Sequence, residues 1–330
     1  MTELKSIIVV LLITLVFMGT NTVITCYAEE EKIYEINNSS NYKQSTYNVL
    51  INFQVDAEYT GEHLLKVLEE LERRGYTTTV YVTGTFAQNN GTTVQNIYKD
   101  GHEIALHGWV TAEKLETMDY NTQKETLISA KNLVEENSQI VVSFRPQYYS
   151  QNEDTYTILD SLNISYNSGF ISNLKYIPGH ENESKPYIVT NHSFYAVPVS
   201  MYETSDEKIY LCDLSASNKY KINGTEWYSV LKNKFDECEE KHEPMVMVLH
   251  PWITGNETTG YWQAFNQFLN YTENKNISVV STKELVDYYG EIQTPIIQTE
   301  TPATPAFEAI SAMSCIYLIV YIMRKIKKNK

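Results

Sequence analysis

The feature that most limits the fold of this chain is a regular alternation of two kinds of segment between residues 47 and 289. Short runs rich in β-branched and aromatic residues alternate with longer stretches whose apolar residues recur at helical spacing. Short links between such segments predict an α/β fold with a parallel sheet, as a barrel or as a doubly wound sheet. The predicted strands are residues 47–53, 77–82, 103–106, 140–144, 165–167, 210–214, 245–249 and 277–280, and the predicted helices are residues 62–74, 93–99, 122–136, 154–162, 226–241, 262–273 and 282–289.

Polar residues directly follow several of these predicted strands. The C-terminal ends of parallel strands meet at one face of an α/β fold, and catalytic groups of such folds are found there. We therefore expect these side chains to converge on one site. They are Gln54, Asp56 and Glu58 after the first strand, and His107, Arg145 and His250 after three later ones.

Four blocks around these positions resemble motifs of the NodB-type polysaccharide deacetylases, carbohydrate esterase family four. Residues 79–84 read Thr-Val-Tyr-Val-Thr-Gly, and residues 101–107 read Gly-His-Glu-Ile-Ala-Leu-His. Residues 144–148 read Phe-Arg-Pro-Gln-Tyr, where the proline follows the arginine directly, and residues 246–251 read Val-Met-Val-Leu-His-Pro. The resemblance covers about residues 47–289, and it implies a distorted (β/α) barrel that acts on N-acetylated polysaccharide.

The resemblance also implies a set of catalytic groups. In this family an aspartate and two histidines hold a divalent metal ion, usually zinc, with a coordination position left open. A second aspartate, two residues before the metal-binding one and held by an arginine, takes a proton from water, and a further histidine protonates the departing amine. By position, the resemblance assigns Asp56 and His107 to the metal, Arg145 to the orienting role and His250 to the general acid.

Two positions of this set are substituted. Gln54 stands where the base is expected, and Thr111, four residues after His107, stands where the second metal-binding histidine is expected. Glutamine does not accept a proton near neutral pH, and general-base catalysis contributes roughly 10² to 10⁴ in rate. A neutral threonine is a poor ligand for zinc. The substitutions therefore predict a weakened or inactive deacetylase.

A rearranged site is the alternative. Residues 54, 56 and 58 would share one side of the first strand if that strand continued so far. In a shifted register Asp56 would be the base and Glu58 a metal ligand, and Glu113 could turn inward as a further ligand. The deacetylase would then be active with a different ligand set.

Aromatic residues lie beside the predicted site. Trp109, Tyr148 and Trp252 are adjacent to the strand-end residues in sequence, and Pro146 lies between Arg145 and Tyr148. Aromatic faces stack on sugar rings, so these residues are candidates for substrate binding. Ordinary packing is the alternative for the tryptophans, and it is the interpretation that we prefer for most of the 26 tyrosines.

The two ends of the chain predict export and anchoring. Residues 1–28 have the charge and apolar pattern of a signal peptide, and residues 29–46 form a linker to the predicted barrel at residues 47–290. Residues 291–305 are a Thr/Pro-rich linker, and residues 306–330 hold an apolar run followed by a basic tail. This tail resembles archaeal C-terminal surface-sorting signals. The basic cluster predicts that the body lies outside the cell, at the membrane.

Charge, sequons and cysteines agree with a surface protein. The net charge is −15, and without Glu3, Lys5 and the five basic residues among the last seven, 20 basic and 40 acidic residues remain, a charge of −20. Such a body repels nucleic acid and favours a neutral or cationic glycan as partner. Cys212 and Cys238 are expected to form a disulfide or to remain two buried thiols. Ten Asn-x-Ser/Thr sequons, typical of a glycoprotein, begin at Asn37, Asn38, Asn90, Asn163, Asn182, Asn191, Asn223, Asn256, Asn270 and Asn276.

Three functional hypotheses follow. The first is a degenerate deacetylase that binds N-acetylated glycan without turnover. The second is an active, metal-dependent deacetylase with a rearranged ligand set around Asp56 and His107. The third is a structural surface glycoprotein in which the barrel is a spacer.

Overall fold

The computed structural model describes residues 47–59 and 61–293. The predicted signal peptide, the N-terminal linker and the anchor lie outside these residues, as does the Thr/Pro linker apart from residues 291–293. Within the described ranges, no helix combines the length and the apolar character needed to cross a membrane.

Strands and helices alternate as the sequence pattern predicts up to residue 171 and again from residue 208, whereas residues 166–210 hold five strands with no helix between them. The strands are β1 Val49–Ala57, β2 Thr79–Val82, β3 Glu103–Leu106, β4 Ser143–Phe144, β5 Tyr166–Ile171, β6 Tyr187–Ile188, β7 Tyr195–Val199, β8 Met201–Glu203, β9 Lys208–Tyr210, β10 Met245–Leu249 and β11 Ile277–Val279. The α-helices are α1 Glu62–Arg73, α2 Gly84–Lys99, α3 Tyr120–Glu136, α4 Glu153–Ser161, α5 Asp213–Asn218, α6 Gly224–Lys241, α7 Pro251–Thr254, α8 Tyr261–Thr272 and α9 Thr282–Gln293. Single 3₁₀ turns are η1 Leu115–Thr117, η2 Gln147–Tyr149 and η3 Glu257–Thr259.

The main sheet is parallel except at one edge. Its strands follow the order β10-β1-β2-β3-β4-β5-β7-β6, and β11 also pairs with β1. Only the β6–β7 pair of this sheet is antiparallel within the described residues. All nine residues of β1 are buried, as expected for a central parallel strand that is covered on both faces.

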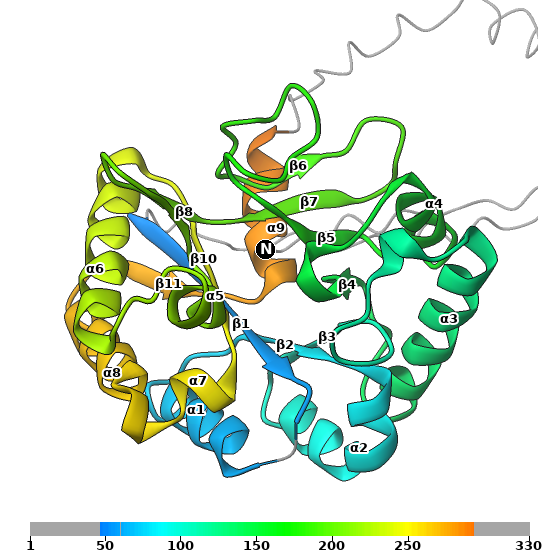
Figure 1. Cartoon of the computed structure of the whole chain (residues 1–330), viewed down its shortest axis with the longest axis horizontal. Helices are drawn as coiled ribbons and strands as arrows, with labels where there is room; N and C mark the ends of the chain where they lie inside the picture. The colour runs from blue at the N-terminus through cyan, green and yellow to red at the C-terminus, as the bar shows by residue number, and fades with distance from the viewer. Residues whose placement is uncertain (1–46, 60, 294–330) are drawn as a thin grey trace, which may run out of the picture. The chain divides into compact units, whose positions relative to one another are not determined.

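The sheet curls into an incomplete barrel (Figure 1). Between β7 and β10 the ladder of strand pairing is replaced by irregular segments that still bridge the gap. The Ser200 amide donates to the carbonyl of Val246 over 3.0 Å, and the Val248 amide donates to that of Leu211 over 2.8 Å. The α/β prediction is therefore confirmed, and the curled sheet is consistent with the distorted barrel that the resemblance implies.

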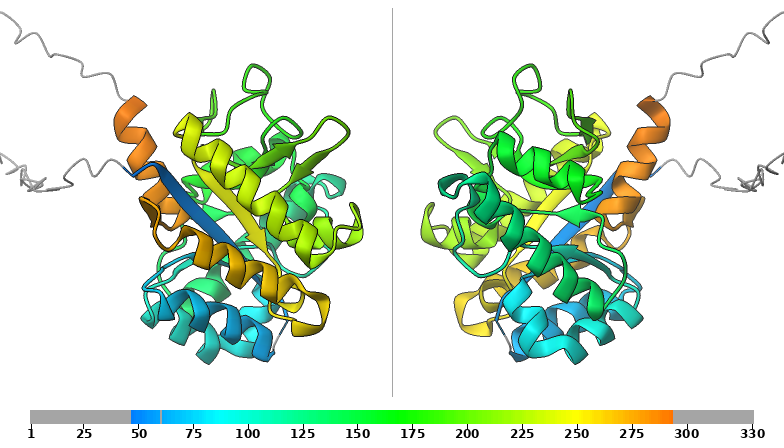
Figure 2. Two further views of the ribbon diagram at one scale, coloured as in Figure 1. Left: turned by 90° about the vertical axis from the view of Figure 1, so that its left-hand side faces the viewer. Right: turned by 90° about the vertical axis from the view of Figure 1, so that its right-hand side faces the viewer.

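Helices cover the outer face of the curled sheet. In α1 the buried residues Leu64, Val67, Leu68 and Leu71 recur at helical spacing and face the core. In the same outer layer, α6 and α8 lie next to β1 and β10 (Figure 2). There Phe265 of α8 meets Phe53 of β1 with ring centroids 5.7 Å apart. This outer layer fixes the strands whose C-terminal ends carry the site.

Several elements extend beyond their predicted ends, among them β1, α2, β5 and α9. β1 continues to Ala57 and so includes Gln54 and Asp56, which we expected after the strand. Their polar side chains interrupt the apolar pattern because they face the interior of the curled sheet. Helix α2 begins at Gly84 instead of residue 93, and it is kinked at Asn90, whose side-chain amide donates to the carbonyl of Phe86 over 3.2 Å.

Of the predicted strand at residues 210–214, only Tyr210 lies in a strand, and Cys212 makes an isolated bridge to Val248. β9 ends at Tyr210, and helix α5 begins at Asp213. The Asp213 carboxylate accepts from the amide of Leu214 over 2.6 Å, so this side chain binds the first turn of the helix.

Cys212 and Cys238 are two separate buried thiols, which is the second of the two expectations for this pair, and no disulfide joins them. Cys212 precedes α5 on the site side of the sheet. Cys238 lies in α6, where its thiol donates to the carbonyl of Pro244 over 3.5 Å.

Candidate active site

The predicted strand-end residues converge. Asp56 is the penultimate residue of β1, and His107, Arg145 and His250 directly follow β3, β4 and β10. All four side chains are buried. The Nε2 atoms of His107 and His250 each lie 3.3 Å from Oδ2 of Asp56, so the three residues form one site at the C-terminal ends of the strands.

Arg145 pairs with Asp56 at the centre of this site. Its Nη2 donates to Oδ1 of Asp56. Beneath it, the Tyr81 ring lies with its centroid 4.7 Å from the guanidinium carbon. Burial lowers the pKa of Arg145 below its ordinary value, an effect that nearby polar groups only partly offset. Arg145 therefore holds one oxygen of Asp56 and leaves the other free to face the two imidazoles.

His107 presents a defined nitrogen to the carboxylates. Its Nδ1 lies 2.6 Å from the backbone carbonyl oxygen of Arg145, an acceptor, so Nδ1 carries the proton and donates it there. Its Nε2 faces Oδ2 of Asp56 at 3.3 Å and Oε1 of Glu58 at 3.4 Å. A backbone carbonyl that orients a histidine in this way is typical of metal sites.

The chemistry of this group of donors calls for a cation. Ligand atoms of Asp56, Glu58 and His107 all lie within 4.8 Å of one another. Oδ2 of Asp56 is buried and has no hydrogen-bond partner among the described residues. Two carboxylates and an imidazole lone pair repel one another unless a metal ion or an added proton lies between them. The residues present therefore fit a divalent ion.

Gln147 orients Glu58. The side-chain amide of Gln147 donates to Oε1 of Glu58, and its own oxygen accepts from the amide of Ala112 over 3.3 Å. Burial raises the pKa of Glu58, but His107 and Gln147 lower it by more, so the pKa is below its ordinary value. Glu58 is therefore held as a carboxylate that faces His107.

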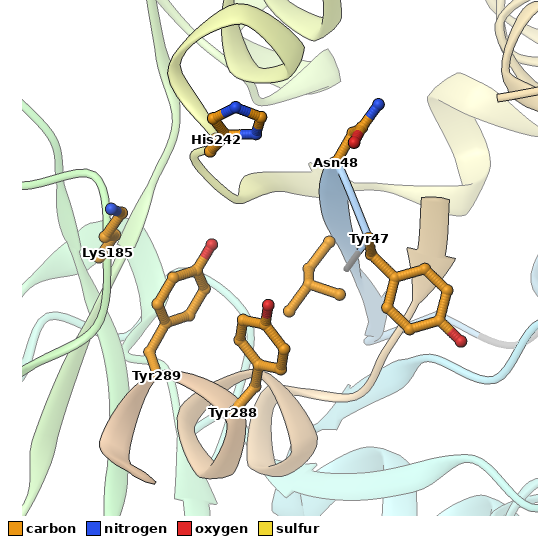
Figure 3. A pocket seen from close by; sticks show the side chains of 7 residues that line it. Tyr47, Asn48, Lys185, His242, Tyr288 and Tyr289 are labelled. Carbon is orange, nitrogen blue, oxygen red and sulfur yellow. The ribbon is translucent and has the colours of Figure 1, made fainter. Parts of the chain in front are cut away.

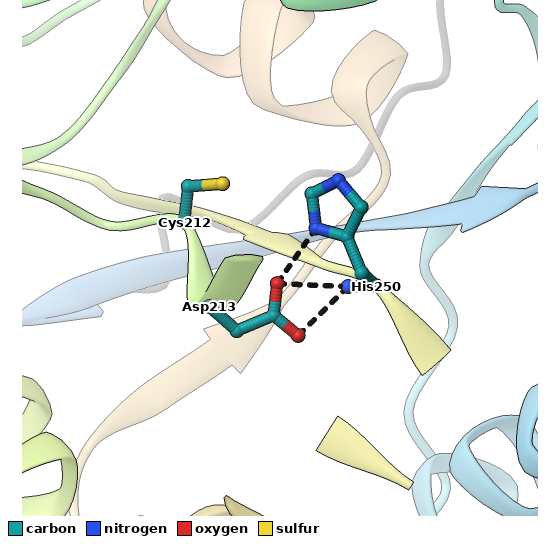
Figure 4. A group of neighbouring side chains, drawn as sticks. All are labelled: Cys212, Asp213 and His250. Atoms are coloured by element: carbon teal, nitrogen blue, oxygen red, sulfur yellow. Dashed lines mark hydrogen bonds and ion pairs between the residues drawn. The ribbon is translucent and has the colours of Figure 1, made fainter. Parts of the chain in front are cut away.

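His250 is held from the opposite side by Asp213 (Figure 4). Its Nδ1 lies 2.7 Å from Oδ1 of Asp213, and its backbone amide donates to both oxygens of that carboxylate, over 3.0 and 2.8 Å. Burial lowers the pKa of His250, but the Asp213 carboxylate outweighs burial and raises the pKa to about 10. Nε2 of His250 therefore presents a proton toward Asp56.

Cys212, Asp213 and His250 form a second group of ligand atoms within 4.8 Å of one another (Figure 4). The Asp213 carboxylate in this group is already bonded to His250, and it also accepts from the hydroxyl of Thr254 over 2.7 Å. A metal ion here would have to displace these bonds. We therefore place the candidate cation site at Glu58 and His107, with Oδ2 of Asp56 beside them, and not at this second group.

Gln54 does not lie at the mouth of the sheet. Its side chain is fully buried, its amide donates to Asn52 over 2.9 Å and to the hydroxyl of Ser168 over 2.7 Å, and its oxygen accepts from the same hydroxyl over 2.9 Å. Two residues of strand separate it from Asp56 by about 7 Å. The resemblance assigns the general base to position 54, but a side chain enclosed in this way does not reach the site where a base would act. The carboxylate that Arg145 holds is that of Asp56.

The loop after β3 gives Thr111 and Glu113 different surroundings. Thr111 is half-buried in the turn that follows Trp109. Glu113 is buried, and its carboxylate accepts from the backbone amide of Trp109 over 3.1 Å. Burial raises the pKa of Glu113 above its ordinary value. Of the two rescue candidates, Glu58 joins the cation site, whereas Glu113 binds the backbone of its own loop.

The aromatic candidates divide between packing and the rim of the site. The Trp109 ring is half-buried, and its Cε3 would lie 2.7 Å from a Cβ atom at Gly84, so glycine there makes room for the indole. Pro146 is buried. Tyr148 is 60% exposed on a backbone with φ of +53°, which is strained for this residue type.

Three contributors to the site are absent from the sequence prediction. They are Asp213 behind His250, Gln147 behind Glu58, and Tyr81 beneath Arg145. Each acts through another side chain, so no strand-end position marks it. Asp213 lies inside the segment that the sequence predicts as a strand, although an aspartate is also a common start of a helix.

A separate cavity of about 190 Å³ lies at the other end of β1 (Figure 3). Tyr47, Lys185, His242, Tyr288 and Tyr289 contribute to its lining. None of the site residues described above lines this cavity, so the candidate site does not depend on it.

The sequence of this chain was compared with protein-family models and with curated proteins. Residues 43–167 match the family model described as polysaccharide deacetylase. Among curated proteins, none matches the chain in sequence.

Solved structures share the fold at low sequence identity. A protein of Pseudomonas aeruginosa PAO1 assigned to the polysaccharide deacetylases is 16% identical, with a TM-score of 0.63 over 75% of this chain and 92% of its own. An allantoinase is 13% identical, with a TM-score of 0.62 over the same shares, 75% and 92%. A carbohydrate esterase family four pseudoenzyme from Bacillus anthracis is 13% identical, with a TM-score of 0.50 over 72% of this chain and 65% of its own.

Proposed function

We propose that this chain, whose residues 43–167 match the polysaccharide deacetylase family model, removes acetyl groups from N-acetylated glycan with a rearranged set of site residues. The observation that carries this proposal is the group of Asp56, Glu58 and His107, in which a buried oxygen without a hydrogen bond lies 3.3 Å from Nε2 of an oriented imidazole. In this register Asp56 is the base, and Glu58 supplies the carboxylate for the metal ion. The substitution at Gln54 then removes nothing from the reaction.

The residues that would hold a divalent ion, zinc by analogy with the family, are Glu58 and His107, with Oδ2 of Asp56 beside them. Such an ion, when bound, polarises the carbonyl of the acetamido group toward attack by water. Gln147 fixes Glu58, and the carbonyl of Arg145 fixes His107, so both donors are oriented before an ion arrives.

Proton transfer follows from the remaining contacts. Asp56 accepts a proton from the attacking water while Arg145 keeps its carboxylate aimed into the site. His250, held by Asp213, donates its Nε2 proton to the nitrogen that leaves. The C–N bond breaks, and acetate and a free amino sugar result.

The test is metal content and acetate release from the purified chain. We expect about one bound zinc per chain, and release of acetate from N-acetylglucosamine oligomers that stops after chelation and returns with added zinc. Glu58→Gln should lose the metal, whereas Glu113→Gln should keep it. Retained metal and activity in Glu58→Gln would contradict the assignment.

Binding of glycan without turnover is the second candidate function. The distances of 3.3 and 3.4 Å from His107 to the two carboxylates are also those of ion pairs, which a doubly protonated His107 would make without any metal. Thr111 in place of a histidine favours this alternative. A metal-free protein that binds the oligomers and releases no acetate would support it.

We also propose that the protein works at the outer cell surface. The signal-like residues 1–28, the apolar and basic residues 306–330 and the ten sequons support this location. It would place the site beside cell-surface or external glycan.

A further inference from the structure

The cavity of about 190 Å³ lies at the end of β1 opposite the candidate active site (Figure 3). Leu50, the second residue of β1, contributes to its lining, whereas Asp56 of the same strand belongs to the active site. The stretch of strand from Leu50 to Asp56 spans roughly 20 Å. A molecule in this cavity therefore does not contact the reacting groups.

Two tyrosines of α9 form one side of the cavity. Tyr289 is buried and belongs to the apolar cluster inside the curled sheet that also contains Leu50, and Tyr288 packs partly buried against this cluster. Their ring centroids lie 5.1 Å apart, with the rings edge to face. Figure 3 shows both hydroxyls directed away from the helix, toward the side where His242 lies. Within the described residues neither hydroxyl makes a hydrogen bond, so both are available to a ligand.

Lys185 and His242 give the cavity its cationic side. Lys185 is half-buried, its Nζ lies 5.8 Å from the ring centroid of Tyr289, and it makes no ion pair within the part of the chain that the structure describes. His242 follows α6 with φ of +51°, a left-handed conformation that usually belongs to glycine at the end of a helix. A histidine in this strained conformation is a reason to look for a function of its ring.

These groups are suited to a carboxylate. An ammonium group and phenol hydroxyls donate hydrogen bonds, and a bond from a charged donor to a carboxylate is roughly twice as strong as one between neutral groups. Burial, more than any neighbouring group, raises the pKa of Tyr289, so its hydroxyl keeps its proton and can donate. Because the body as a whole is acidic, only these local groups attract an anion.

The size and lining of the cavity limit the ligand. Its volume of about 190 Å³ corresponds to roughly six water molecules, at about 30 Å³ each. The described lining residues include one lysine and no arginine, whereas phosphate is commonly held by a bidentate arginine. Leu50 and the rings of the tyrosines supply apolar surface. A small carboxylate with an apolar group fits these features better than a phosphate.

From this geometry we propose that the cavity is a binding site for a small organic carboxylate. The carboxylate accepts from Lys185 and from the two hydroxyls of α9, with His242 beside it, and the apolar part of the ligand lies on Leu50 and the tyrosine rings. The site is distinct from the proposed deacetylation and does not depend on it.

The test is a calorimetric titration of the purified chain with benzoate, a carboxylate attached to an apolar ring. We expect a Kd of about 1 mM or lower, as is typical for so small a ligand. Benzamide has nearly the same shape but no charge, and inorganic phosphate has charge but no apolar part. Each should bind about tenfold more weakly or worse. Equal binding of benzamide would exclude recognition of the carboxylate, and tighter binding of phosphate would contradict the proposed ligand class.

Matched variants locate the site. Lys185→Met removes the ammonium and keeps the apolar stem, so the Kd for benzoate should rise about tenfold or more. Lys124→Met is the control, because Lys124 is also half-buried and lies 5.8 Å from the ring centroid of Tyr120, on α3 and outside the cavity lining. It should bind benzoate like the unaltered chain. Tyr289→Phe keeps the ring and should weaken binding about threefold or more.

One substitution should strengthen binding. Glu243 contributes to the raised pKa of Tyr289, so its negative charge lies near the cavity. Glu243→Gln should therefore lower the Kd for benzoate by about two- to fivefold. Three results would overturn the site: no benzoate binding by the unaltered chain, unchanged binding in both Lys185→Met and Tyr289→Phe, or loss of binding in Glu58→Gln. The last result would place benzoate at the candidate cation site instead.

Discussion

Gln54 and Asp56 are two residues apart on β1 and face the same interior, yet their surroundings differ. Gln54 is enclosed by Asn52 and Ser168, and its amide is fully bonded. Asp56 has one oxygen on Arg145 and a second oxygen that lacks a hydrogen-bond partner in the described chain. A neutral side chain suits the first place, and a carboxylate suits the second. The functional carboxylate of this strand is therefore at position 56.

This assignment predicts opposite results for two small substitutions. Asp56→Asn should keep the fold and lower kcat for acetate release by roughly 10² to 10⁴, the contribution of a general base. Gln54→Asp should gain no activity and should lower the free energy of unfolding by roughly 1–3 kcal/mol, since it buries a carboxylate among groups arranged for an amide. Kinetics and urea unfolding check both. A gain of activity in Gln54→Asp would place the base at position 54 instead.

A second prediction at the level of single residues concerns the role of Gln147 in orienting Glu58. Gln147→Met keeps the length of the side chain but removes the amide that donates to Glu58. Zinc affinity, measured by calorimetry, should fall about 10- to 100-fold, as is usual when a group that orients a metal ligand is lost. Gln151→Met is the matched control, because Gln151 is equally buried but donates to the carbonyl of Gly169. Similar zinc affinities in both variants would exclude this role for Gln147.

At the scale of elements, a histidine joins α4 to the loop between β6 and β7. Nδ1 of His192 lies 2.7 Å from Oδ2 of Asp160, and its Nε2 lies 2.9 Å from Oε1 of Glu153. Burial lowers the pKa of His192, but the two carboxylates outweigh burial and raise it. The pKa of Asp160 is lowered, because the Ser193 and His192 contacts outweigh burial.

The directions of these pKa shifts determine how the stability contributed by the contacts of His192 with Asp160 and Glu153, here called the clamp, depends on pH. A raised histidine pKa gives stability that is fully present below about pH 6.5, the unfolded value, and is lost as pH rises through the folded pKa. A lowered aspartate pKa gives stability that is present above about pH 3.9 and is lost as pH falls. His192→Gln should therefore lower the urea midpoint most between about pH 4 and 6.5, and least above pH 8. A difference that grows above pH 8 would contradict the clamp.

The elements also show what the sequence could and could not predict. Helical spacing located α1, α6 and α8 closely, because one face of each packs on the core. The sequence places the end of β1 at residue 53, four residues too early. The interior of a curled sheet accepts polar side chains such as Gln54, whereas a pattern of apolar residues stops there. The positions of His107, Arg145 and His250 were predictable from strand ends. Their partners Asp213 and Gln147 could not be predicted in this way. They lie at the start of α5 and of η2, and their distance from the site depends on how the sheet curls.

For the whole molecule, charge and site agree on the kind of partner. The body carries about twice as many acidic as basic residues, 40 against 20 once the tail and the residues Glu3 and Lys5 are set aside. At long range such a body repels polyanions. At the site, the buried carboxylates of Asp56 and Glu58 are also negative, and the exposed rings suit neutral sugars. The net charge of the body and the side chains of the site both favour an uncharged glycan over an acidic one.

The last prediction concerns where the molecule works. The apolar residues 309–323 and the basic cluster after them predict an anchor whose charged end stays in the cytoplasm, with the body outside. The full chain should therefore be found with the membranes, and protease added to intact cells should digest the body. A variant without residues 306–330 should appear in the medium with an unchanged unfolding midpoint, since the described core ends at residue 293. A variant without residues 294–305, which leaves α9 intact, controls for the deletion and should remain anchored. Protection of the body from protease in intact cells would place the site inside the cell, where external glycan does not reach it.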